Sequence, residues 1–107
     1  MDFEITPEEL KGKLDAGDRP VLLDIRDQWE YEAARISGSK HIPMDQIPGR
    51  VHQELDPEEH IVVICHHGIR SANVTNWMRL QGFENVQSLR GGLDQWSRQI
   101  DPKVPVY

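Results

Sequence analysis

Two short runs of apolar residues stand out along the chain, at 20–25 and 61–65, and each lies between turn-forming or polar residues. Strands that are buried on both faces of a parallel sheet have nearly continuous apolar sequences instead of an alternating pattern. The two runs therefore predict interior strands. Weaker patterns predict short strands at 3–5, 40–43 and 86–89.

Helical signals alternate with these strands. Thr6 and Glu9 have the spacing of a capping box and Pro7 suits the first helical turn, which predicts a short helix ending near Gly17. In the segment 71–81, apolar residues recur with helical spacing. Helices are also predicted for residues 27–36 and 93–99. The pattern of residues 44–55 is ambiguous, and a helix is expected there after Pro48.

The alternation of strands and helices with short connections predicts an α/β domain with a mostly parallel central sheet and helices on both faces. A chain of 107 residues has the usual length of one domain, so we expect residues 1–107 to form a single domain. Ligands of such sheets bind at the carboxyl ends of the strands. Cys65 ends the strongest predicted strand and is therefore a candidate functional residue.

Composition narrows the classes of function. The 18 acidic and 12 basic side chains give a net charge of −6, which argues against a nucleic-acid-binding protein. No apolar run is long enough to span a membrane, and the first residues lack the basic and apolar stretches of a signal peptide. The single cysteine excludes an intramolecular disulfide and a Cys-rich zinc site, and it suits a reducing compartment. We therefore expect a cytoplasmic protein that binds neither nucleic acid nor membranes.

The charge is unevenly distributed along the chain. Residues 1–60 carry fifteen acidic and seven basic side chains, whereas residues 61–83 contain no acidic residue at all. Cys65 lies in this acid-free segment. The distribution predicts a locally basic surface around the cysteine, suited to an anionic ligand.

The segment from Cys65 to Arg70, Cys-His-His-Gly-Ile-Arg, links a predicted strand to a helix N-terminus. Free backbone N–H groups and the helix dipole stabilise an anion at such a place. Gly68 allows the tight curl that turns N–H groups inward, and Arg70 supplies a fixed positive charge. His66 and His67 supply further hydrogen-bond donors. The loop therefore favours a thiolate at Cys65, and hence a nucleophile.

Two other interpretations of this loop are weaker. A lone cysteine after a buried strand is more often an inert core residue, but an inert residue needs no histidines, glycine and arginine beside it. The adjacent His66 and His67 suggest part of a metal site, yet no further Cys or His stands at usual ligand spacing. We therefore expect no metal site.

Asp24 and Arg26 stand at the end of the other predicted interior strand, near the same edge of the sheet. They form either an ion pair that holds the exit of this strand or a part of the catalytic machinery. The structural role is favoured over the catalytic one, since ion-pair networks with a structural role are found outside active sites as well.

Short motifs follow one another along nearly the whole chain, at residues 22–26, 29–31, 35–43, 61–72, 82–86, 89–96 and 104–107. In order and spacing they resemble the single-domain rhodanese family, whose members are sulfurtransferases. One departure is mild: Ala34-Arg35 stand where many members have Gly-His. The resemblance implies a rhodanese-like three-layer domain, and it implies that neither a cofactor nor a metal is needed.

The resemblance also implies a role for each residue of the loop. Cys65 carries a persulfide, and the backbone from His66 through His67, Gly68 and Ile69 to Arg70 cradles its sulfur. Arg70 organises the loop, and His66 and His67 shape donor binding. The implied partners are a small-molecule sulfur donor such as thiosulfate and a thiol or protein acceptor. Because histidines replace the Arg or Lys of many members, thiosulfate binding is expected to weaken as the pH rises.

Loop length separates sulfur transfer from related activities. Six residues run from Cys65 to Arg70, and phosphatases and arsenate reductases of related fold have a longer loop that fits a tetrahedral oxyanion. The shorter loop favours a single sulfur atom. An oxyanion enzyme and a non-catalytic binding or regulatory module stay as alternatives, and the chain is expected to be a monomer or a homodimer.

Overall fold

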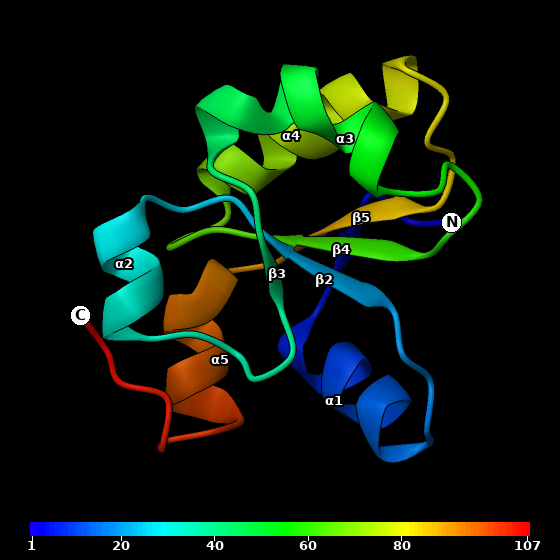
Figure 1. Cartoon of the computed structure of the whole chain (residues 1–107). Helices are drawn as coiled ribbons and strands as arrows, with labels where there is room; N and C mark the ends of the chain where they lie inside the picture. The colour runs from blue at the N-terminus through cyan, green and yellow to red at the C-terminus, as the bar shows by residue number, and fades with distance from the viewer.

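The computed structural model describes residues 1–107 as a five-stranded parallel sheet with helices between the strands (Figure 1). The strands are β1 (Glu4–Ile5), β2 (Val21–Asp24), β3 (Lys40–His41), β4 (Ile61–Ile64) and β5 (Val86–Leu89). Their order across the sheet is β1-β5-β4-β2-β3, and every neighbouring pair is parallel. The helices are α1 (Pro7–Asp15), α2 (Gln28–Ala33), α3 (Ile47–Glu54), α4 (Ile69–Leu80) and α5 (Gly92–Gln99), and a 3₁₀ turn at Met44–Gln46 precedes α3. None of these helices has the length and apolar character that crossing a membrane requires.

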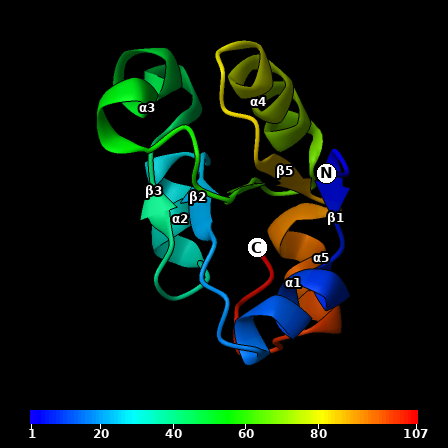
Figure 2. The ribbon, with the colours of Figure 1, turned by 90° about the vertical axis from the view of Figure 1, so that its right-hand side faces the viewer.

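Helices cover both faces of the sheet. Figures 1 and 2 show α3 and α4 on one face and α1, α2 and α5 on the other. Each face has its own hydrophobic core: Met78 and Phe83 belong to the core beside α3 and α4, and Leu10 and Trp96 belong to the core beside α1 and α5. The predicted α/β architecture, a parallel central sheet between two helical layers, is confirmed.

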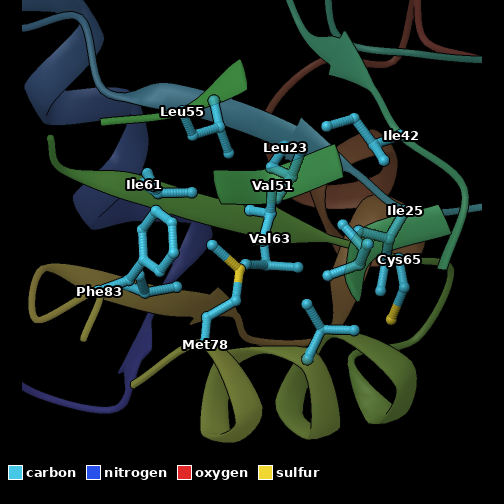
Figure 3. Packing of buried hydrophobic residues seen from close by; sticks show 13 residues of the cluster. Leu23, Ile25, Ile42, Val51, Leu55, Ile61, Val63, Cys65, Met78 and Phe83 are labelled. Carbon is cyan, nitrogen blue, oxygen red and sulfur yellow. The ribbon is translucent and has the colours of Figure 1, made fainter. Parts of the chain in front are cut away.

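The central strand β4 carries Cys65 at its carboxyl end. All four residues of β4 are buried. Because successive side chains of a strand point to opposite faces, Val63 enters the core beside α4, whereas Val62 and Ile64 enter the other core. Cys65 follows in the same alternation and lies on the side of Val63, as Figure 3 shows. Burial on both faces explains the continuous apolar sequence of this strand.

Three helix boundaries differ from the sequence prediction. α2 ends at Ala33 instead of residue 36, because Ala34 has extended backbone angles (φ −162°, ψ 142°). α3 begins at Ile47, ahead of Pro48, because a proline fits the first turn of a helix. α4 begins at Ile69 instead of residue 71, because Gly68 takes a φ of 100° and turns the chain directly into the helix.

Candidate active site

Cys65 lies at the floor of the loop that joins β4 to α4. Its side chain is almost fully buried, at 1% exposure. The Sγ atom accepts hydrogen bonds from the backbone N–H of Gly68 at 3.0 Å and of Ser71 at 3.2 Å, and it lies 3.3 Å from the hydroxyl of Ser71. The thiol donates to the Ser71 hydroxyl oxygen, and two N–H dipoles converge on the sulfur, an arrangement that stabilises negative charge there.

The turn between β5 and α5, which contains Gly91 and Gly92, packs against the outside of this loop. A Cβ on Gly92 would overlap the carbonyl oxygens of Cys65 and His66, and a Cβ on Gly68 would approach the backbone nitrogen of Gly91. The first turn of α5 donates to the same two carbonyls, from Leu93 N–H to Cys65 at 2.8 Å and from Asp94 N–H to His66 at 3.1 Å. These two loop carbonyls therefore bind to α5, whereas the N–H groups of Gly68 and Ser71 bind to the sulfur.

Ser71 connects the sulfur to a buried hydroxyl of β5. Its Oγ lies 2.7 Å from Oγ of Ser88 and 3.2 Å from the carbonyl oxygen of Gly68. Both serine side chains are fully buried. Ser71 is the first residue of the helix predicted for 71–81, and nothing local in the sequence shows that Ser88 lies beside it.

Arg70 binds Glu30 of α2 through its guanidinium. Its two terminal nitrogens donate to the two carboxylate oxygens at 2.9 and 3.0 Å. Hydrogen bonding to Glu30 raises the pKa of Arg70 further, against the effect of burial. Burial alone would raise the pKa of Glu30, but hydrogen bonds from Arg70, the Asp27 backbone and Tyr107 lower it to about 2. Both groups are charged at neutral pH, so this pair ties the loop to α2.

A buried network extends from Glu30 to Arg26 and Asp24. Tyr107 donates its hydroxyl hydrogen to Glu30 at 2.7 Å and accepts a hydrogen bond from Arg26 at 2.9 Å. Burial, together with the bond to Glu30, raises the pKa of Tyr107 to about 12. Arg26 also donates twice to the carboxylate of Asp24, at 2.7 and 2.8 Å. Asp24 and Arg26 thus form a buried ion pair with one another, which supports the structural role for this pair.

His66 and His67 line the mouth of the site in different ways. His66 packs edge-on against the ring of Tyr107, with centroids 4.2 Å apart, and its Nδ1 faces Glu30 at 3.9 Å. Burial, followed by the neighbouring charge of His67, lowers the pKa of His66. His67 is exposed, and its ring lies 4.0 Å from that of His66.

The locally basic surface expected from the charge distribution is not present in space. Glu30 contacts Arg70, and Asp94 donates its backbone N–H to the loop. Both acidic residues lie outside the segment 61–83 in the sequence. The fold brings acidic side chains from α2 and α5 to the loop, and these offset its positive charge. Sequence windows count only neighbours along the chain, so this prediction is wrong.

A pocket of about 270 Å³ opens above the cysteine, and it is lined by Cys65, His66, His67, Ile69 and Arg70. The structure thus brings the candidate residues of the loop together, with Gly68 beneath them as a donor to the sulfur. The supporting residues Glu30, Ser88 and Tyr107 come from distant parts of the chain. Glu30 forms a capping box with Asp27 at the start of α2, but that local spacing does not reveal its contact with Arg70.

Comparison with known proteins places this site in a family. Residues 6–99 match the model of the rhodanese-like domain. The chain is 36% identical over 99 residues to thiosulfate sulfurtransferase GlpE of Glaesserella parasuis, covering 92% of this chain and 90% of that protein. A crystal structure of a rhodanese-like domain protein from Staphylococcus aureus superposes with a TM-score of 0.85 at 28% identity, over 99% of both chains.

Other relatives are longer proteins. The rhodanese-like/PpiC domain-containing protein 12 of Arabidopsis thaliana is 34% identical over 110 residues, which are 97% of this chain and 37% of that protein. The chain likewise spans 52% of the putative sulfur carrier protein YrkF of Bacillus subtilis, at 37% identity over 92% of its own length. The match to the family model nevertheless covers most of the chain. The protein belongs to the rhodanese-like domain family.

Proposed function

We propose that the protein is a sulfurtransferase in which Cys65 is the nucleophile and the persulfide carrier. The observation that carries this proposal is the convergence of two backbone N–H groups on the sulfur of Cys65, at the floor of an open pocket. Family membership supports it, as does similarity to a protein named as a thiosulfate sulfurtransferase. The 107 residues act as one domain, without cofactor or metal.

The reaction has two steps. The Cys65 thiolate attacks the outer sulfur of a donor such as thiosulfate, an S–S bond forms to Cys65, and the S–S bond of the donor breaks with release of sulfite. The outer sulfur of the resulting persulfide then carries the negative charge, within the pocket lined by the loop. A nucleophilic acceptor, cyanide or a thiol, next attacks this sulfur and takes it, which regenerates the thiolate.

The surrounding residues have distinct tasks in this proposal. The N–H groups of Gly68 and Ser71 stabilise the anionic sulfur without a change of protonation. Arg70 holds the loop through Glu30, and His66 and His67 shape the entrance used by the donor.

The single cysteine limits where the sulfur goes next. The chain has no second thiol that resolves the persulfide, so the acceptor is a separate thiol or protein. A thiolate that works by exchange favours a reducing compartment such as the cytoplasm. The six-residue loop favours a single sulfur atom over a tetrahedral oxyanion, so a phosphatase or arsenate reductase activity is not proposed.

The test is a thiosulfate-dependent assay of the intact chain and of Cys65→Ser. Incubation with thiosulfate is expected to add the mass of one sulfur atom to the wild type, and addition of cyanide is expected to release thiocyanate. Cys65→Ser loses both, whereas His52→Ala, which removes an exposed imidazole from α3, keeps both. Thiocyanate release by Cys65→Ser, or hydrolysis of an aryl phosphate by the wild type in place of sulfur transfer, overturns the proposal.

A further inference from the structure

Three potential metal ligands meet at the mouth of the Cys65 pocket. One ring nitrogen each of His66 and His67 and a carboxylate oxygen of Asp94 all lie within 4.8 Å of one another. The two histidines belong to the β4–α4 loop, and Asp94 belongs to the first turn of α5. Their separation along the chain hides this grouping from any search for ligand spacing in the sequence.

The separations suit a transition metal. Metal–ligand bonds of about 2.0–2.2 Å place the ligand atoms of a tetrahedral site about 3.3 Å apart. The observed upper limit of 4.8 Å is therefore longer by an amount that side-chain rotation removes. His67 is exposed, and its one ring contact is an edge-on one with His66 at 4.0 Å, so a rotation of its side chain is the movement that the closure requires.

The backbone that carries the three ligands is already fixed. Asp94 N–H donates to the carbonyl oxygen of His66 at 3.1 Å, and Leu93 N–H donates to that of Cys65 at 2.8 Å. These bonds join the loop to α5 directly beneath the candidate ligands. A site held in this way loses little conformational entropy when a metal binds.

The side chains are also oriented for ligation. Nδ1 of His66 lies 3.9 Å from a carboxylate oxygen of Glu30, too far for a hydrogen bond, but on a side of the ring that leaves Nε2 for a metal. Arg98 contacts Oδ2 of Asp94 at 3.1 Å, but its side chain is 61% exposed. An exposed pair of this kind is weak, so it competes little with a metal ion.

We propose that His66, His67 and Asp94 bind a divalent transition-metal ion, of which Zn²⁺ is the representative, at the entrance to the Cys65 pocket. Two imidazoles and a carboxylate are ligands that Zn²⁺ accepts, with a fourth position left to water. The metal serves no catalytic step. Because both histidines line the pocket, the bound ion closes the path of the sulfur donor, and this consequence rests on the proposed function.

Zinc binding to the tag-free chain is the direct test, measured by competition with a chromophoric chelator. The wild type is expected to bind one Zn²⁺ per chain. His67→Ala and Asp94→Asn each lower the affinity at least about tenfold, since loss even of an outer partner of a metal site has an effect of that size. Cys65→Ser and the surface control His52→Ala keep the wild-type affinity. Circular dichroism verifies that each variant is folded.

Cobalt substitution separates this site from simple capture by the thiol. Co²⁺ bound by nitrogen and oxygen ligands gives weak visible bands without the intense sulfur-to-cobalt charge-transfer absorption of a thiolate site. That spectrum is expected for the wild type and is lost in Asp94→Asn. A charge-transfer band that disappears in Cys65→Ser, or an affinity that Asp94→Asn and His67→Ala leave unchanged, overturns the proposal.

Sulfur-transfer rates complete the test. Zn²⁺ inhibits the wild type, and Asp94→Asn needs at least about ten times more Zn²⁺ for the same fractional inhibition of its own rate. If the chain transfers no sulfur, the binding and cobalt measurements still decide whether the site exists. Inhibition with equal potency in Asp94→Asn contradicts closure of the pocket by this ion.

Discussion

Glu30 allows a quantitative test of how the candidate site is held together. Its side chain is 6% exposed, and its carboxylate accepts hydrogen bonds from Arg70, Tyr107 and the backbone of Asp27. Glutamine has nearly the same shape without the charge. Glu30→Gln therefore removes the ionic interaction with Arg70 and leaves the space filled.

The pKa of Glu30 sets the size of the effect. Burial alone would raise this pKa, but the hydrogen bonds, first that from Arg70, lower it from 4.5 to about 2. One pKa unit corresponds to about 1.4 kcal/mol, so the charge adds roughly 3 kcal/mol to the free energy of unfolding at neutral pH. Because the pKa is lower in the folded state, this contribution is present above pH 4.5 and is lost as the pH falls toward 2.

Urea denaturation at two pH values measures the effect. Glu30→Gln is expected to be less stable than the wild type by roughly 3 kcal/mol at pH 7 and by only about 1.5 kcal/mol at pH 3. Glu54→Gln is the matched control: hydrogen bonds from Arg50 and then Lys40 also lower the pKa of Glu54 to about 2, but this pair lies at the surface. Solvent and salt screen it, so its deficit is smaller and disappears at high ionic strength.

Two outcomes would refute this reasoning. The first is a deficit of Glu30→Gln that is equal at pH 7 and pH 3, because a loss independent of pH comes from packing and not from charge. The second is a deficit no larger than that of Glu54→Gln at low salt, because the burial of Glu30 would then add nothing to its interaction with Arg70.

Three further substitutions test the loop and the core. Gly92→Ala is expected to lower the free energy of unfolding by at least about 1 kcal/mol and to reduce sulfur transfer, since the new Cβ overlaps two loop carbonyls. Its control is Gly12→Ala, which has open space around it and is expected to be neutral or stabilising. Equal effects of the two substitutions would contradict the role of the Gly91-Gly92 turn. Ser71→Ala is expected to cost about 1–3 kcal/mol in urea denaturation, because the fully buried hydroxyl of Ser88 loses its partner 2.7 Å away; a loss below about 0.5 kcal/mol would contradict this buried contact. Met78→Ala, at a fully buried position, is expected to lower the free energy of unfolding by about 2–5 kcal/mol in urea denaturation. Leu80 is 76% exposed, so Leu80→Ala is expected to cost less than about 0.5 kcal/mol. Comparable losses would contradict the assignment of the core.

Local signals were sufficient for most of the fold. The capping box predicted from Thr6 and Glu9 forms with both hydrogen bonds, at 2.9 and 3.1 Å. The apolar run 61–65 became the central strand, because burial on both faces leaves no room for alternation. The Cys65 loop was also predictable, since its function depends on consecutive residues and on one glycine that takes a positive φ.

The supporting residues of the site were not predictable, because contacts between distant segments depend on how the elements are placed in space. Tyr107 reaches Glu30 across 77 positions of the sequence, and Ser71 reaches Ser88 across 17. Neither pair has a spacing or a pattern that marks it. The same reason explains the error about charge: a window around Cys65 contains no acid, yet the fold brings Glu30 to the loop from α2.

That error changes the explanation of how the site stabilises an anion. The guanidinium of Arg70 binds Glu30, which offsets its charge, and burial lowers the pKa of His66. What remains within hydrogen-bond distance of the sulfur is the pair of N–H groups of Gly68 and Ser71 and one hydroxyl. Fixed backbone dipoles do not titrate, so the stabilisation of a thiolate or persulfide is independent of the protonation of the histidines.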